Sequence, residues 1–221
     1  MTLGKEIDLL KNYPQSKRDV SGRLASKTEE DKCIAQKFGK EFFDGSRNHG
    51  YGGFSYNPRF WQPVVPRFQK HWNLKSNDSV LDVGCAKGFM LYDLKESIPD
   101  LKVNGVDISK YAIANTKKEI SRFCQVANAI SLPYDDSSID VVISVNTLHN
   151  LNESDIKMAL LEVERVKKRG SFITLDAYRN DEEKERMEAW NLTAKTVMHA
   201  NQWKEFFNDI GYTGDYYWFI P

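Results

Sequence analysis

The feature that most constrains this chain is the segment 80–88, which reads Val-Leu-Asp-Val-Gly-Cys-Ala-Lys-Gly. A short apolar run carries an acid near its end, breaks into a turn of small residues, and is followed by a helical pattern over 89–97. Gly84 and Gly88 can adopt positive φ and let the backbone approach a ligand closely. The segment therefore predicts a buried parallel strand followed by a helix, with a nucleotide bound at the start of that helix.

The spacing of the small residues separates two cofactor classes. A dinucleotide fingerprint needs G-x-G-x-x-G/A, whereas the matching positions here are Gly84, Ala86 and Phe89. A phenylalanine in the third place would obstruct close helix–strand packing. Read from Asp82, the pattern acid-x-Gly-x-small-x-Gly resembles motif I of the class I S-adenosylmethionine (SAM) methyltransferases, although that family usually has Gly where Ala86 stands. A Gly-rich strand–turn–helix connection without a ligand is the alternative interpretation.

Two later positions extend this resemblance. Asp107 ends the next apolar run, one helix and one strand after Asp82, where a carboxylate can accept hydrogen bonds from both ribose hydroxyls. This role serves NAD and SAM equally, and a helix cap is the alternative. Asn128 stands where the family often carries an Asp that meets the adenine amino group, and an amide oxygen can still accept that bond. A plain turn residue is the alternative for Asn128. The resemblance covers about residues 72–178.

The resemblance implies SAM as the cofactor and S-adenosylhomocysteine (SAH) as the product. It also implies a cofactor-binding set drawn from the strand ends and from a preceding aromatic segment. These residues are Asp82, Gly84, Cys85, Ala86, Gly88, Asp107, Ile108, Asn128, Ala129, Asn146, Tyr51, Tyr56 and Trp61. No metal site is predicted, because the three cysteines are scattered without metal-ligand spacing.

Strand and helix patterns alternate through the middle of the chain, which predicts an α/β fold with a doubly wound, mostly parallel, Rossmann-like sheet. We expect strands at 79–83, 102–107, 123–127, 139–145 and 171–177, and helices at 88–97, 109–121 and 153–167. A helix over 181–197, a second helix over 202–209 capped by Asn201, and a last strand over 212–220 are expected to follow. The family order 3-2-1-4-5 places the cofactor crevice at the carboxyl ends of the first and fourth strands.

Residues 1–70 are predicted to form a helical extension and lid, and residues 71–221 the SAM-binding catalytic domain, within a single globular unit. Apolar spacing predicts one helix over 28–43. The segment 44–62 mixes glycine with aromatic residues, including Tyr51, Gly52 and Gly53, and this mixture is typical of a mobile lid. The alternative is that these rings dock the N-terminal helices. His49 is the titratable candidate in the lid, and a surface histidine is its alternative.

Composition limits the partners. The 31 basic and 31 acidic residues cancel, and no basic stripe indicates long nucleic acid. No apolar run approaches the roughly 20 residues that span a bilayer, so no membrane association is expected. Three scattered cysteines fit a reducing compartment, which predicts a cytoplasmic protein. The predicted partner is a small-molecule acceptor, and a homodimer is left open.

Candidates for the chemistry follow the fourth and fifth strands. His149 and Asn150 should lie at the rim of the crevice, where His149 is either a general base or a helix residue. In the stretch 176–180, Tyr178 is a catalytic candidate and Arg179 could hold a phosphate or carboxylate. A salt bridge to the acidic run 181–183 is the alternative for Arg179. Trp190 is a candidate wall of the substrate pocket. The catalytic set is thus His49, His149 and Tyr178, and the substrate set is Arg179, Asn150 and Trp190.

The stretches 51–53, 146–150 and 176–180 also resemble small-molecule methyltransferases of bacterial surface-polysaccharide (capsule) biosynthesis. That resemblance implies O-methylation of a sugar or of a nucleotide- or phosphate-linked precursor. A non-catalytic SAM-binding protein and a protein methyltransferase are the alternatives.

Overall fold

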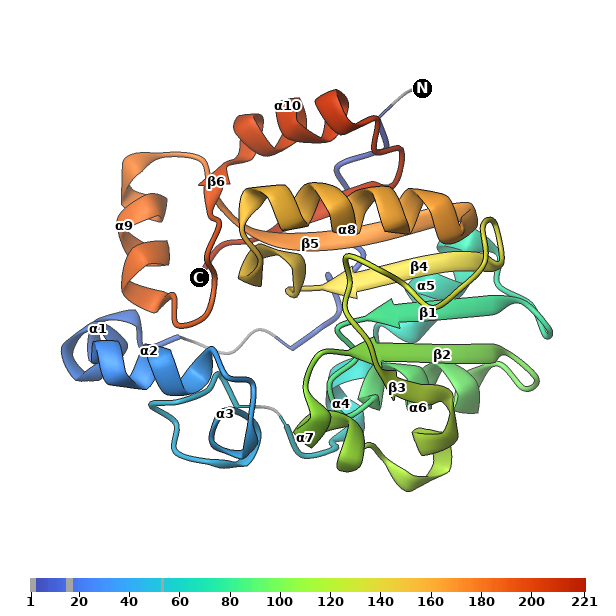
Figure 1. Ribbon diagram of the computed structural model, residues 1–221, viewed down its shortest axis with the longest axis horizontal. Coiled ribbons are helices and arrows are strands. Elements are labelled where there is room, and N and C mark those ends of the chain that lie inside the picture. The colour runs from blue at the N-terminus through green and yellow to red at the C-terminus, as the bar shows by residue number, and fades with distance from the viewer. Residues whose placement is uncertain (1–2, 15–17, 53) are drawn as a thin grey trace.

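The computed structural model describes residues 3–14, 18–52 and 54–221. These residues form a seven-stranded sheet in the order β3-β2-β1-β4-β5-β6, and β7 also pairs with β5 (Figure 1). Each pairing between these strands is parallel. The strands are β1 Ser79–Val83, β2 Lys102–Asp107, β3 Cys124–Val126, β4 Ile139–Val145, β5 Lys167–Tyr178, β6 Met198–His199 and β7 Asp215–Phe219. The predicted fold class and the order of the first five strands are confirmed.

Helices cover both faces of the sheet. One face carries α8 Glu153–Val166 and α10 Ala200–Ile210, and the other carries α5 Val65–Trp72, α6 Phe89–Ser97 and the 3-10 helix η1 Lys118–Phe123. Because each strand alternates its side chains between two covered faces, apolar residues occupy both. Leu81 of β1 packs in the core with α8, whereas its neighbour Val80 packs in the core with α6.

The remaining helices lie beyond the carboxyl ends of the strands (Figure 1). They are α1 Val20–Ser26, α2 Glu29–Ala35, α3 Lys40–Asp44, α4 Pro58–Trp61, α7 Lys110–Ala114, the 3-10 helix η2 Leu148–Asn150 and α9 Asp181–Trp190. Within the described part of the chain, no helix has both the length and the apolar character needed to cross a membrane.

Several predicted helices are shorter in the structure, and local backbone geometry explains where they end. The predicted helix 28–43 divides into α2 and α3, because Phe38 adopts a φ of 47°. The predicted helix 109–121 divides into α7 and η1. The predicted helix 181–197 ends at Trp190, where the Asn191 side chain accepts a hydrogen bond from the Ala194 amide and forms a turn.

The helix α10 is capped two residues earlier than expected. The His199 side chain, and not Asn201, forms the cap by accepting a hydrogen bond from the Asn201 amide. The start of the chain is tied to the end of the sheet, since the Ile7 amide donates to the Tyr216 carbonyl at 2.9 Å. Leu9 then joins the core beneath α5. The division at residue 70 stays a prediction.

Candidate functional site

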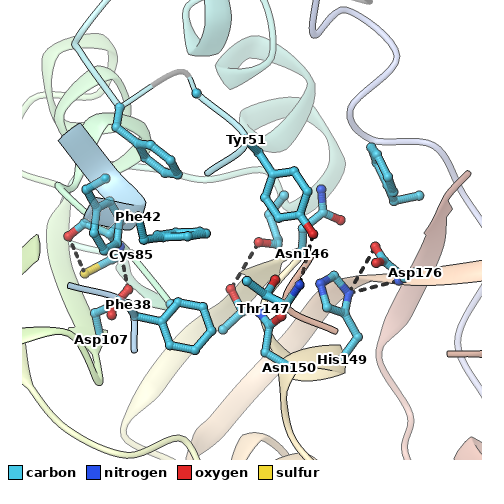
Figure 2. Close-up of a pocket in the computed structure, with 18 of the residues that line it drawn as sticks. Phe38, Phe42, Tyr51, Cys85, Asp107, Asn146, Thr147, His149, Asn150 and Asp176 are labelled. Carbon is cyan, nitrogen blue, oxygen red and sulfur yellow. Dashed lines mark hydrogen bonds and ion pairs between the residues drawn. The ribbon is translucent and has the colours of Figure 1, made fainter. Parts of the chain in front are cut away.

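A cavity of about 1260 Å³ opens at the carboxyl ends of β1, β2, β4 and β5. Figure 2 shows Asp107 at one end of this cavity and the pair His149 and Asp176 at the other, with Asn146 and Thr147 between them. Parallel topology creates this arrangement, because the carboxyl ends of parallel strands meet at one edge of the sheet. The cavity therefore has two ends with different chemistry.

The turn after β1 brings backbone to the cavity wall. Gly84 has a φ of +87°, and a Cβ there would lie 2.1 Å from Thr147 Oγ1 and 2.7 Å from Thr147 Cβ. The amides of Gly84 and Cys85 both donate to the Val106 carbonyl, at 2.8 and 3.0 Å, which ties the turn to β2. Glycine at 84 thus lets the turn pass close to Thr147 at the cavity wall.

Gly88 has a different function in the same turn. It begins α6 with a φ of +76°, and a Cβ there would lie 2.3 Å from Ile120 Cδ1. It does not line the cavity, whereas Gly84, Cys85 and Ala86 do. Gly88 therefore packs the turn against η1, and its contact with the cofactor stays a prediction.

Asp107 closes the turn from the β2 side. Its Oδ2 accepts a hydrogen bond from the Ala86 amide and its Oδ1 from the Ser109 amide, both at 2.8 Å. Each carboxylate oxygen can accept a further bond, so the clamp leaves capacity for ligand hydroxyls. The neighbouring Ile108 is 56% exposed and lines the same cavity, which gives this end an apolar surface.

Asp82 lies between these groups at the end of β1. It is 5% exposed, lines the cavity, and makes no side-chain hydrogen bond or ion pair within the described ranges. Burial, with the nearby negative Asp107, raises the pKa of Asp82 to about 8. A buried carboxyl of this kind gains a counter-charge if a cationic ligand enters the cavity.

Asn128, Ala129 and Asn146 also line the cavity. The Asn128 side chain accepts a hydrogen bond from the Ile130 amide at 3.2 Å, so Asn128 acts as a turn residue, the alternative given for it above. Its role at adenine stays a prediction. Asn146 adopts a φ of 52°, and its Oδ1 accepts a hydrogen bond from Thr174 Oγ1 at 2.8 Å.

The far end of the cavity is built around His149 and Asp176. His149 Nδ1 accepts a hydrogen bond from the Asp176 amide at 3.0 Å, and Asp176 Oδ1 lies 3.3 Å from the same nitrogen. The neutral ring therefore carries its proton on Nε2 and presents a donor. Burial lowers the pKa of His149 to about 3 and raises the pKa of Asp176 to about 8. Asp176 is the stronger candidate for a base near neutral pH.

Asp176 was missing from the predicted site residues, although the sequence contains a signal for it. Asp82 and Asp107 both stand near the ends of strands, and Asp176 stands near the end of β5 in the same way. Nearby, Asn150 also lines the cavity, and its Oδ1 is buried without a hydrogen-bond partner in the described residues.

Tyr51 connects the N-terminal segment to this end of the cavity. Its hydroxyl accepts hydrogen bonds from the amides of Leu192 and Thr193, at 2.7 and 3.2 Å. Its ring lies 5.8 Å from the ring of Trp190 and also contacts Phe42 of α3. Both sequence interpretations are therefore present, because the ring lines the cavity and docks the N-terminal helices. Trp61 lines the cavity as well.

Two lid candidates lie outside the cavity. His49 Nε2 lies 3.2 Å from Asp31 Oδ1, so the ring is held against the start of α2. The Tyr56 hydroxyl donates to Asp93 Oδ1 at 2.8 Å and its ring packs against Phe89. Neither residue lines the cavity, and their roles in catalysis and in cofactor binding stay predictions. Gly53, in the predicted lid, lies outside the described residues.

Two candidates at the end of β5 also lie outside the cavity. The Tyr178 ring packs against His199, 5.6 Å between ring centroids, away from the cavity. The Arg179 side chain is 61% exposed and forms an ion pair with Glu183 at 2.7 Å, which is the alternative considered for it. Both lie past Asp176, where β5 leaves the cavity to pair with β6.

About half of this chain is similar in sequence to known proteins. An uncharacterized protein of Methanocaldococcus jannaschii is 38% identical over 111 residues, 50% of this chain and 41% of that protein. The tRNA (carboxymethyluridine(34)-5-O)-methyltransferase of Arabidopsis thaliana is 31% identical over 122 residues, 55% of this chain and 28% of that enzyme. The chain thus matches less than half the length of these relatives.

Solved structures share the fold at low identity. A SAM-dependent methyltransferase from Aquifex aeolicus aligns with a TM-score of 0.50 and 18% identity over 88% of this chain and 89% of that one. A geranyl diphosphate C-methyltransferase from Streptomyces coelicolor A3(2), solved with Mg²⁺, geranyl diphosphate and SAH, aligns with a TM-score of 0.54 and 14% identity over 68% and 60%. A family model described as methyltransferase domain matches residues 74–213. Because that match includes β1 to α10 and every strand-end acid of the cavity, the chain belongs to the methyltransferase domain family.

Proposed function

We propose that the chain is a SAM-dependent methyltransferase that transfers a methyl group to an oxygen of a small polar acceptor. The observation that carries this proposal is the two-ended cavity. One end holds the clamped carboxylate of Asp107, and the other holds the buried Asp176 beside His149. SAM is the cofactor and SAH the product.

The residues at the Asp107 end fit this cofactor. Asp107 has fixed oxygens with capacity for ribose hydroxyls, and Ile108 offers an exposed apolar face for a base. Asp82 is a buried carboxyl with no side-chain partner among the described residues, and it suits the ammonium of a methionine moiety. The turn at Gly84 allows close approach of backbone. We assign cofactor binding to Asp82, Gly84, Cys85, Ala86, Asp107, Ile108, Asn128, Ala129 and Asn146. When bound, the cofactor supplies an electrophilic methyl group.

The residues at the other end suit a hydroxyl acceptor, which must lose a proton. A carboxyl with a pKa near 8 is partly ionised at neutral pH and can receive that proton, so we assign Asp176 as the general base. His149 holds the backbone at Asp176 and directs Nε2–H as a donor, so we now place it as a positioning residue and not as the base.

The N-terminal segment excludes water from this end. Tyr51 accepts hydrogen bonds from the amides of Leu192 and Thr193, so the lid is held against the segment that follows α9. Excluding water protects a reactive methyl donor from hydrolysis and strengthens hydrogen bonds within the cavity.

The acceptor we favour is a sugar or a nucleotide- or phosphate-linked precursor. One relative is named as a tRNA methyltransferase, but a chain with equal numbers of acidic and basic residues lacks the excess positive charge that long RNA requires. A protein acceptor and a non-catalytic SAM-binding role are the competing functions.

Calorimetric titration with SAM, SAH and NAD, followed by a methyl-transfer assay, tests the proposal. We expect SAM and SAH to bind and NAD not to bind. Transfer of labelled methyl to sugars or sugar nucleotides, but not to amines, would support O-methylation. Binding of NAD without SAM would contradict the proposal, and SAM binding with no transfer to sugars, amines or peptides would favour a non-catalytic protein.

A further inference from the structure

The acceptor end of the cavity contains an unusual group of cations. Arg18, Arg23 and Arg47 all line it, and all three come from the N-terminal segment that covers the strand ends. None of the three has a carboxylate within ion-pair distance in the part of the chain that the structure describes. By contrast, Arg165 and Arg179, outside the cavity, both form ion pairs at 2.7–2.8 Å.

Arg23 is the most deeply placed of these cations. It is 8% exposed, and its Nη2 donates to the carbonyls of Gly50 and Arg47, at 3.0 and 3.4 Å. Its guanidinium lies 4.6 Å from the Trp190 ring and 5.2 Å from the Tyr51 ring. Carbonyls and aromatic faces orient a guanidinium but do not neutralise it. A buried cation without a counter-charge is costly, so the position favours an anionic ligand.

Arg47 places a second positive charge beside the first. It is exposed toward the cavity, and its proximity to Arg23 lowers the pKa of Arg23, after the larger effect of burial. The backbone beneath it is shaped to allow this, because a Cβ on Gly52, which has a φ of +79°, would lie 2.5 Å from Arg47 Nη1. Two neighbouring guanidiniums repel one another unless an anion lies between them.

Arg18 and the aromatic residues complete the region. The Arg18 guanidinium lies 4.6 Å from the Phe219 ring and 6.0 Å from the Trp190 ring. Trp190 is therefore flanked by Arg18 and Arg23. The nearest acid in sequence, Asp19, is occupied at the start of α1, where it accepts a hydrogen bond from the Gly22 amide. Among the described residues, Asp176 attracts Arg18 without an ion pair at short distance, whereas Arg23 and Arg47 have no carboxylate at ion-pair distance.

We propose that the methyl acceptor carries an oxyanion, a carboxylate or a phosphate, that binds between Arg23 and Arg47 beside the Trp190 ring. This inference rests on the proposed function and names the substrate class of the same site. Guanidinium groups bind planar or tetrahedral oxyanions through paired N–H donors. The anion would fix the acceptor at the lid, while its hydroxyl reaches Asp176 on the sheet side of the cavity.

The test uses the full chain saturated with SAH and two separate probes, inorganic phosphate and acetate. Binding is followed by calorimetry and by tryptophan fluorescence, since Trp190 lies next to the proposed anion. We expect saturable binding of at least one probe, weakened about tenfold or more in Arg47→Gln because a charge-assisted hydrogen bond is lost. Arg179→Gln, which removes an exposed arginine outside the cavity, should bind like the unaltered protein.

The outcomes separate the two proposals. Tighter binding of phosphate identifies a phosphorylated acceptor, and tighter binding of acetate identifies a carboxylated one. Absence of saturable binding to either probe, equal binding in Arg47→Gln and Arg179→Gln, or binding only when SAH is absent would overturn the inference. SAH affinity in each variant reports whether it is folded. If SAH itself does not bind, the proposed function has failed and not the anion site alone.

Discussion

At the residue scale, three aspartates near strand ends show how environment sets chemistry. Asp107 has two amide donors, Asp82 has no side-chain partner in the described residues, and Asp176 lies beside a neutral histidine. Burial raises the pKa of all three carboxyls. In the sequence, each of the three stands near the end of a strand. Different hydrogen-bond partners therefore separate a ribose-type site, a cation-type site and a base-type site among residues of one type.

Replacing Asp107 with alanine tests the ribose assignment. We expect SAM affinity to weaken by roughly 1–3 kcal/mol, because charge-assisted hydrogen bonds to the ligand are lost. The SAM affinity of Asp107→Asn should lie between those of the unaltered protein and Asp107→Ala, because the amide oxygen retains part of the acceptor capacity. Calorimetry measures both, and Asp209→Ala on the exposed side of α10 is the control. Unchanged affinity in Asp107→Ala would refute the assignment.

Asp82 should couple SAM binding to proton release. In the free protein burial holds its pKa near 8, so at neutral pH most of the population is protonated. A bound ammonium favours the carboxylate, which lowers this pKa and expels the proton. Affinity should therefore rise as the pH approaches about 8, and above that pH it should fall as the ligand's own ammonium loses its proton. Calorimetry in buffers of different ionisation enthalpy measures the protons, and Asp82→Asn should bind more weakly and release fewer. Equal proton release by the unaltered protein and Asp82→Asn would argue against this role of Asp82.

Asp176→Asn should lower kcat by roughly 10²–10⁴, because the acceptor hydroxyl loses its base, while SAH affinity stays unchanged. In the unaltered enzyme the rate should increase with pH through about 8, because the base must be ionised. His149→Gln should reduce the rate but keep this pH dependence. If the rate of Asp176→Asn still increases with pH through about 8, a residue other than Asp176 is the base.

At the element scale, the turn after β1 depends on Gly84 for two separable reasons. An alanine there would adopt a strained φ of +87° and would collide with Thr147, whose Cβ would lie at 2.7 Å and cannot move by side-chain rotation. Gly211 has a similar φ of +77° but open space around it. Gly211→Ala should cost about 1 kcal/mol of unfolding free energy from strain, and Gly84→Ala clearly more. Urea denaturation measures the loss of unfolding free energy in both variants. Equal losses would show that the structure around Thr147 shifts enough to remove the clash.

The strands were predictable because their information is local. Buried parallel strands are short apolar runs, and alternation with helices sets their order. Helix ends were less predictable, since the break at Phe38 depends on its backbone conformation in the packed lid. The strand-end acid Asp107 follows from topology. Arg179, which lies between β5 and α9, pairs instead with Glu183 in the first turn of α9. Arg23 comes from α1, within the predicted helical extension, and no sequence pattern indicates that this particular side chain lines the cavity.

At the scale of the whole molecule, the cavity is closed by segments far apart in the chain. Lys27, just after α1, donates to the carbonyls of Glu188, Ala189 and Asn191 at 2.8–3.0 Å and so holds the end of α9. Tyr51 holds the segment that follows α9. The N-terminal extension, α9 and the segment that follows α9 thus form one cover over the end of the cavity that holds His149 and Asp176. A change in either segment should affect binding of the acceptor more than binding of the cofactor.

The same cavity should make the stability of the free protein depend on pH. An aspartate in the unfolded chain has a pKa of about 3.9, whereas Asp82 and Asp176 have pKa values of about 8 when folded. Between these pH values the folded state binds more protons than the unfolded state. The contribution of the two carboxyls to stability is therefore complete below about pH 4 and is lost as the pH rises to about 8. Above that range the two carboxylates are ionised in both states and the loss is constant.

Urea denaturation at several pH values measures this effect through the difference between the unaltered protein and Asp82→Asn/Asp176→Asn. An asparagine cannot ionise, so the double variant should gain stability relative to the unaltered protein as pH rises from about 5 to about 9. SAM should reduce that difference at high pH, because it stabilises ionised Asp82 as well as the folded state. A difference that is flat with pH would mean that both acids are already ionised at neutral pH, which would remove the reason for treating Asp176 as a poised base.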